Sequence, residues 1–227
     1  MAIYLKKFET MSQYNAYTAD TANFILPNVS LTVDNDTVHY NPSTPPTPVE
    51  TRVVAKFDVT DTSNPTQIIG EYADSPFSAI EIDGVEQPSV VSAYTFSFST
   101  GGEHTVKYTL TDPTSIGTYA FYECYSLTSI DIPNNSITSI SDYAFYGCFR
   151  LTSVVIPDSV TSIGEYAFND CSQLESFTVM ATTPPSMNGI FGGEMSTPTI
   201  YVPSESVETY KSTINWSSYA SAIEPIP

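Results

Sequence analysis

Apolar residues recur at two different spacings along this chain of 227 residues, and each spacing predicts a different kind of element. Between residues 111 and 180, leucine, isoleucine, phenylalanine and cysteine return about every two dozen positions. Cys124, Cys148 and Cys171 mark this repeat at intervals of 24 and 23 residues. A repeat of this length predicts a short solenoid of three repeats, in which like positions stack on one another.

Within each repeat, a Tyr-Ala-Phe turn precedes a strand whose apolar side chains alternate. The turns are residues 119–121, 143–145 and 166–168. One interval is a residue longer, and we expect the extra residue in the turn at 133–137, where it leaves the strands in register. The side chains predicted to point inward are Leu127, Ile130, Ile132, Leu151, Val154, Ile156, Leu174, Phe177 and Val179.

Strand patterns also fill residues 49–110, which we expect to form an Ig-like or β-sandwich-like domain. Asp83-Gly84 and Gly101-Gly102 are hairpin turn signals. We expect the last strand of this region to cap the open end of the solenoid, because bare strand edges invite unwanted pairing. The predicted strands are 53–59, 67–72, 78–82, 93–99 and 103–110.

Residues 1–42 form a separate segment with a predicted β-hairpin, in which 28–33 and 37–40 alternate around a turn. A proline-rich stretch follows, and we assign residues 43–48 to an extended linker. The segment 1–42 is therefore a candidate anchoring arm.

Residues 181–227 break the repeat pattern. A last strand at 199–203 precedes a predicted helix with Ser204 as its N-cap. Its apolar face carries Val207, Tyr210 and Ile214 at helical spacing. We expect this C-terminal capping helix to close the far end of the stack.

Charge and composition narrow the classes of function. Acidic residues outnumber basic ones 25 to 7, and the net charge of −18 argues against binding to nucleic acid or to anionic membranes. No signal peptide is recognisable at the start, and no apolar run is long enough to cross a bilayer. We therefore expect the chain to stay where it is made, unless it leaves by lysis or inside a larger particle.

Candidate catalytic and metal-binding residues are few. The three cysteines occupy one equivalent position per repeat, which predicts buried thiols that pack a turn, with a metal or redox role as the alternative. His39 and His104 fall in different predicted units, and Asp34 and Asp36 are typical of a turn rather than of a calcium site. We expect no metal, no cofactor and no enzyme activity; a carbohydrate-acting enzyme is the alternative, although no close carboxylate pair is marked.

Residues 156–177 resemble the BspA-like leucine-rich repeat, and residues 200–211 resemble the closing segment of that family. The resemblance implies a curved solenoid with a parallel sheet on one face, used on surfaces for adhesion and protein recognition rather than catalysis. The stretch 5–14, with 27–31 and 38–40, resembles N-terminal modules on structural proteins of gut bacteriophages.

Several residues near the repeat strands suggest a binding face. Core positions should recur, but the aromatic residues beside the first two strands are missing from the third repeat, so we predict that they are exposed. The alternative is a tyrosine-rich surface that packs partly between repeats. The candidate residues are Tyr122, Tyr125, Tyr146, Phe149, Arg150, Ser129, Asp131, Ser153 and Val155.

These observations predict a mainly β, non-enzymatic structural and binding protein. The first hypothesis is a bacteriophage virion component, such as a head fibre, decoration or tail appendage, exposed on the virion surface. Residues 1–42 would dock on other virion proteins, the chain would form a homodimer or homotrimer, and the repeats would bind a surface protein or glycan receptor. The alternative is a bacterial cell-surface adhesin module of the BspA-like type.

Overall fold

The computed structural model describes residues 29–34, 37–42, 51–74, 76–87, 95–134, 136–192 and 197–227. The chain divides into two compact units, residues 1–49 and 50–227. In the first unit, β1 (Val29–Asp34) and β2 (Thr37–Pro42) pair antiparallel in one uninterrupted register. The predicted hairpin is confirmed, whereas the predicted linker 43–48 lies outside the described residues.

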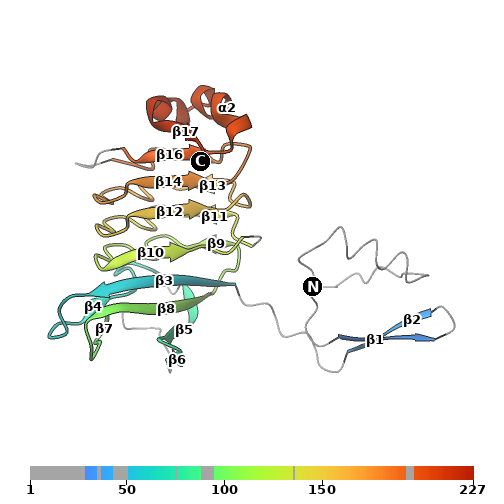
Figure 1. Cartoon of the computed structure of the whole chain (residues 1–227). Coiled ribbons are helices and arrows are strands. Elements are labelled where there is room, and N and C mark those ends of the chain that lie inside the picture. Colours follow the sequence, from blue (N-terminus) through green and yellow to red (C-terminus); the bar gives the residue numbers. More distant parts are fainter. Residues whose placement is uncertain are drawn as a thin grey trace. The chain divides into compact units, whose positions relative to one another are not determined.

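The second unit begins with a five-stranded antiparallel sheet in the order β10-β3-β8-β5-β6 (Figure 1). Alternate residues of β3, from Val53 to Val59, are buried, as the period of a half-buried strand requires. Asp83 and Gly84 both have positive φ at the β5–β6 turn, which confirms the predicted hairpin. The strands are β3 (Arg52–Val59), β5 (Phe77–Ile82), β6 (Val85–Glu86), β8 (Gly102–Leu110) and β10 (Leu127–Asp131).

Two strands of this region are shorter than the sequence predicts. In the regions of the predicted strands 67–72 and 93–99, the described residues form only the short strands β4 (Thr66–Gln67) and β7 (Thr95–Phe96). These two strands pair with each other. The chain after β4 instead turns onto the first repeat, where the Gly70 amide donates a hydrogen bond to the Ala120 carbonyl at 2.9 Å. That contact replaces the ladder that a longer strand would have made.

The strand that meets the repeats is β3, not the predicted 103–110 strand. β3 pairs antiparallel with β10, and β8 is the next strand along the sheet. Phe57 lies opposite Leu127, and both are fully buried. The sheet and the repeats therefore share one continuous hydrophobic core.

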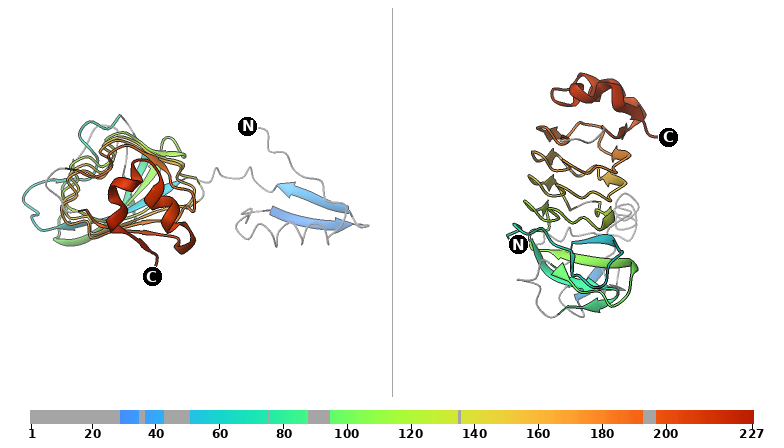
Figure 2. Two further views of the ribbon diagram at one scale, coloured as in Figure 1. Left: turned by 90° about the horizontal axis from the view of Figure 1, so that it is seen from above. Right: turned by 90° about the vertical axis from the view of Figure 1, so that its left-hand side faces the viewer.

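The repeats pair in parallel and stack as coils (Figures 1 and 2). One parallel sheet has the order β15-β13-β11-β9, with the four serines that begin these strands in register. The other has the order β12-β14-β16-β17. We number coils 1 to 4 from the short strands β9 (Ser115–Ile116), β11 (Ser139–Ile140), β13 (Ser162–Ile163) and β15 (Ser186–Met187). The longer strands are β12 (Ser153–Ile156), β14 (Ser176–Val179), β16 (Thr199–Val202) and β17 (Ile223–Pro225).

The apolar positions that recur in the sequence form the interior of the stack, as predicted, and all nine predicted inward residues are buried. Phe145 lies fully buried between Phe121 and Phe168, with ring centroids 5.2 Å and 4.9 Å away and planes inclined by only 6° and 11°. The Tyr-Ala-Phe segments are turns, as expected.

The cysteine thiols are buried beside this phenylalanine stack and none forms a disulfide. Cys148 Sγ donates to the Phe121 carbonyl and Cys171 Sγ donates to the Phe145 carbonyl, both at 3.2 Å. These two thiols thus join their coils to the preceding ones, and burial of all three agrees with the packing role that the sequence predicted.

The repeat ladder does not stop at residue 180, where the sequence predicted its end. β15 pairs in register with β13, and β16 pairs with β14, so the described residues 186–192 and 197–202 form a fourth coil. The Tyr166 amide donates to the Gly189 carbonyl and the Phe168 amide to the Ile190 carbonyl. Tyr166 and Phe168 are two positions apart, whereas their partners Gly189 and Ile190 are adjacent in sequence. Coil 4 therefore lacks a residue equivalent to Tyr166.

Helical turns close the far end of the stack (Figure 2). They are η1 (Ser204–Ser206), α2 (Val207–Ser212) and η2 (Trp216–Ala222). Tyr210 and Trp216 are fully buried and donate hydrogen bonds of 2.7 Å to the carbonyls of Ala181 and Pro185. The predicted capping helix is confirmed in α2, but two details were wrong: Ser204 caps no helix through its side chain, and Ile214 lies beyond the helix and is 82% exposed.

Candidate functional site

The candidate site lies where the chain turns between the short and long strands of coils 1 to 3. Each Tyr-Ala-Phe turn buries its alanine and phenylalanine and places its tyrosine outside the core. Tyr119, Tyr143 and Tyr166 all have a φ between 55° and 59°, a left-handed conformation that few residues other than glycine adopt. The same backbone conformation in successive coils is what aligns these three rings.

The outer tyrosines stack from coil to coil. Tyr143 lies between Tyr119 and Tyr166, with centroid distances of 5.2 Å and 5.4 Å. A second ladder joins Tyr122 to Tyr146 at 5.1 Å, with planes inclined by 12°.

A third ladder consists of Tyr125 and Phe149. Their rings stack at 4.9 Å with an inclination of 13°, and both side chains are 43% exposed. The four aromatic residues of the predicted binding face are therefore brought together in two stacks, Tyr122 with Tyr146 and Tyr125 with Phe149. The rings of the second stack are exposed.

Tyr72 completes this surface and was missed by the sequence analysis. It is 62% exposed and meets Tyr119 and Tyr122 edge-on at 5.8 Å and 5.5 Å. Its position depends on the Gly70 contact to coil 1, which no local pattern signals. We call the following set the tyrosine surface: Tyr72, Tyr119, Tyr122, Tyr125, Tyr143, Tyr146, Phe149 and Tyr166.

The tyrosine surface ends at coil 3 for identifiable reasons. Asn169 occupies the place of Tyr122 and Tyr146, and Gly192 follows it in coil 4, as the amide-to-carbonyl steps show. A Cβ atom at Gly192 would lie 2.3 Å from Asn169 Oδ1, so a larger residue there would force the Asn169 side chain to move. Asn169 is buried, and its Oδ1 has no hydrogen-bond partner among the described residues.

Carboxylates lie beside the tyrosine hydroxyls. Burial, together with the nearby Glu123 carboxylate, raises the pKa of Tyr122 to about 12 and also raises the pKa of Tyr125. The Asp170 carboxylate raises the pKa of Tyr146. These phenols therefore stay protonated at neutral pH.

Arg150, a predicted member of the binding face, forms an ion pair with the antiparallel sheet. Its guanidinium pairs with the Asp58 carboxylate at 2.8 Å and donates to the Asp58 carbonyl at 3.1 Å. Asp58 lies at the end of β3, so Arg150 joins coil 2 to the antiparallel sheet. The distance of 92 residues between the partners explains why the sequence alone did not reveal the pair.

The remaining predicted residues lie on β10 and β12. Asp131, Ser153 and Val155 are exposed, whereas Ser129 is half-buried opposite Lys56 of β3. Among the described residues, no hydrogen bond, ion pair or ring contact links these four side chains to the tyrosine surface. Their membership of a binding face stays a prediction.

The histidine near the β8 turn has a structural environment. His104 is buried, with Nδ1 2.6 Å from Asp83 Oδ2 and Nε2 2.9 Å from the Thr100 carbonyl. Burial lowers its pKa, but the hydrogen bonds to Asp83 and Thr100 outweigh burial, and the net shift is upward. His39 lies in the first unit, whose side chains are not described.

Within the described parts of the chain, no three side chains of His, Cys, Asp or Glu converge on a point where a metal ion could be held. Among the helices described here, none has both the length and the apolar character that a bilayer crossing demands.

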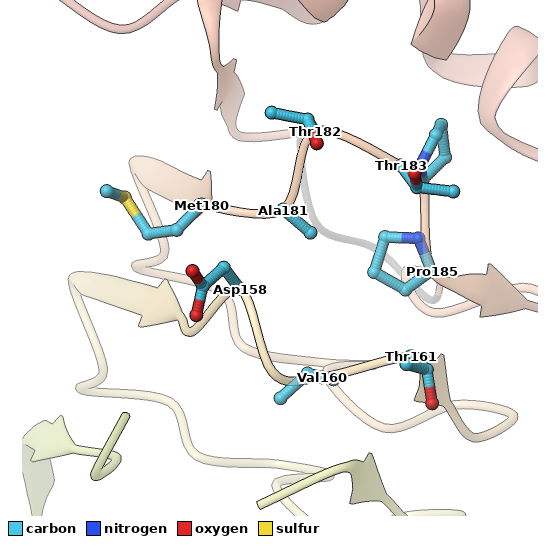
Figure 3. Close-up of a pocket in the computed structure, with 9 residues that line it drawn as sticks. Asp158, Val160, Thr161, Met180, Ala181, Thr182, Thr183 and Pro185 are labelled. Carbon is cyan, nitrogen blue, oxygen red and sulfur yellow. The ribbon is translucent and has the colours of Figure 1, made fainter. Parts of the chain in front are cut away.

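A separate recess of about 310 Å³ lies between the turns that follow β12 and β14 (Figure 3). Asp158 and the exposed Met180 stand on one side of it, and Thr183 and Pro185 on the other (Figure 3). No charged side chain other than Asp158 lines it.

Comparisons with known proteins address the repeats. Residues 89–220 match the family model described as BspA type Leucine rich repeat region (6 copies). A solved structure of a leucine rich cell surface protein from Faecalibacterium prausnitzii A2-165 is 37% identical over 33% of this chain and 19% of that one, with a TM-score of 0.30. The pneumococcal vaccine antigen PcpA is 22% identical over 49% of this chain and 32% of that one, with a TM-score of 0.33.

The chain thus covers less than a third of the length of either solved protein. No curated protein matched it. The family model, in contrast, spans more than half of the chain and includes all four coils up to η2. This protein belongs to the BspA-type leucine-rich repeat family.

Proposed function

We propose that this protein is a non-enzymatic binding protein that contacts a protein partner through the tyrosine surface. The observation that carries the proposal is the stacked pair Tyr125 and Phe149, each 43% exposed beside half-buried tyrosines. Exposed aromatic clusters of this kind are enriched at the centres of protein interfaces. Partial packing between the coils, the alternative in the sequence analysis, accounts for the stacking but not for this exposure.

The proposal includes the finer architecture that the sequence suggested. The four coils are a short leucine-rich-repeat solenoid, and the antiparallel strands before them are an Ig-like or β-sandwich-like module that closes its first end. This arrangement supports the function because both elements hold rings of the tyrosine surface: Tyr72 comes from one, and the stacked ladders come from the other.

The proposed place of action is a bacterial cell surface, as the membership of the BspA-type family suggests. The predicted virion role has no support from the comparisons, and most of the segment that carried it lies outside the described residues. Antibody labelling of intact producing cells, together with mass spectrometry of purified phage particles, separates the two. Copies found only in particles would overturn the proposed location.

Binding can be tested with the full chain on beads against a panel of purified extracellular proteins and glycans. The site variant carries Tyr125→Ser and Phe149→Ser. The control is Ile214→Ser, which removes a side chain that is 82% exposed at the far end of the stack. Loss of protein binding in the site variant alone is expected, whereas equal binding by all three chains would refute the proposed surface.

A further inference from the structure

The tyrosine surface has an acidic border. Glu123 lies near Tyr122 and Tyr125, and Asp170 lies near Tyr146. The Tyr119 and Tyr143 amides donate to the carbonyls of Asp142 and Glu165, and the Asp142 carboxylate accepts a hydrogen bond from the Glu165 amide at 2.8 Å. Asp142 and Glu165 are exposed, and the other two carboxylates are half-exposed. Four negative charges therefore lie beside the rings of the tyrosine surface.

Basic side chains that could neutralise this border are occupied elsewhere. Among the five lysine and arginine residues in the described ranges, four form ion pairs with Glu81, Glu103 or Asp58. The fifth, Lys211, lies on α2 in the cap. None of these ion pairs involves the four carboxylates of the border, so the described basic side chains leave its negative charge in place.

This border argues against a second copy of the chain as the occupant. Two such surfaces that met face to face would bring eight carboxylates together without a counter-charge, and like charges across an interface cost several kcal/mol. A flat sugar ring cannot stack on the covered ring faces of the ladders. Tyr143 is covered by neighbouring rings on both sides, and Tyr122 and Tyr146 cover each other.

The exposed aromatic rings of the tyrosine surface can bind cations. The face of an aromatic ring is electron-rich and attracts lysine and arginine side chains. Phe149 has no ring beyond it in coil 3, where Ser172 follows, and Tyr166 has no equivalent in coil 4. Tyr72 is the most exposed ring of the set, at 62%. Phe149, Tyr166 and Tyr72 are therefore the rings of the tyrosine surface that a cation can reach.

We propose that the partner of the tyrosine surface is a basic protein segment, whose lysine or arginine side chains pair with Glu123 and Asp170 and lie against the accessible rings. This inference rests on the proposed function, because it names the chemistry of the partner at the same surface. Charge complementarity of this kind sets specificity and the rate of association.

The test measures binding of the full chain to two synthetic peptides, one of alternating arginine and serine and one with glutamine at each arginine. The site variant carries Glu123→Gln and Asp170→Asn. Its control carries Glu205→Gln and Glu224→Gln, which remove the same charge from exposed positions in the C-terminal cap. Fluorescence anisotropy at low and moderate salt reports the affinity, since exposed charges are screened beyond about 10 Å at 0.1 M salt.

The arginine peptide should bind at least about tenfold more tightly than the glutamine peptide, and the site variant should lose about tenfold while the control loses less than about twofold. Equal losses in both variants would mean diffuse attraction to an acidic protein and would overturn the inference. Binding that ignores charge but is lost with Tyr125→Ser and Phe149→Ser would refute the basic partner and leave the proposed function intact. Binding unaffected by either kind of change would refute both.

Discussion

Phe145 is the position where the stack should be most sensitive to truncation. It is fully buried and has a parallel ring on each side, at 5.2 Å and 4.9 Å. Replacing a buried phenylalanine by alanine costs about 3–5 kcal/mol, and the two lost ring contacts place Phe145→Ala near the upper end of that range. The matched control is Phe149→Ala in the same coil, which removes a ring that is 43% exposed and stacked on one side only. We expect about 1 kcal/mol there.

Urea unfolding followed by two probes measures both variants. Far-UV circular dichroism reports the whole chain, and the single tryptophan, Trp216, reports the buried cap on coil 4. If the coils unfold as one unit, both signals should shift together to lower urea for Phe145→Ala. Equal costs for the two phenylalanines, or a cost below about 2 kcal/mol at Phe145, would refute the reasoning from stacked buried rings.

Three further predictions concern other parts of the second unit. The cysteine thiols should not react with a thiol reagent in the native protein and should all react in urea, because burial raises the pKa of Cys171 to about 12 and shifts the others upward as well. Stability should fall as pH rises above about 6.5, because the raised pKa of His104 means that its protonated form, paired with Asp83, stabilises the fold at lower pH. Gly70→Ala should destabilise by more than about 2 kcal/mol, because the added Cβ would lie too close to the Tyr119 carbonyl oxygen.

Each of these has an internal control. Rapid labelling of the folded chain would contradict the thiol placement. Asp83→Asn should remove most of the decline in stability with pH, and an unchanged profile would exclude His104 as its source. Gly84→Ala meets no atom within 4 Å and carries only the strain of its φ of +84°, so it should cost about 1 kcal/mol. A larger loss there than at Gly70 would contradict the close approach at coil 1.

Local repetition made the interior of coils 1 to 3 predictable, because the same side chains return in the same register. Coil 4 was not predicted because Met187 and Ile190 replace the isoleucine and alanine of the other coils and one position is deleted. The backbone ladder nevertheless continues. Tyr72 and the partner of Arg150 depend on contacts between segments far apart in the chain. Such contacts follow from how the sheet meets the coils, which the spacing of apolar residues does not specify.

The stack of coils is closed at both ends by unlike elements, β3 on one side and the helical cap on the other. Growth at either terminus would break a fitted junction, so lengthening by gene duplication is confined to the middle. A tandem copy of coil 2 would insert Tyr143, Tyr146 and Phe149 once more and leave both junctions untouched. The two closed ends thus leave the middle coils as the place where the aromatic columns could be lengthened without changing either junction.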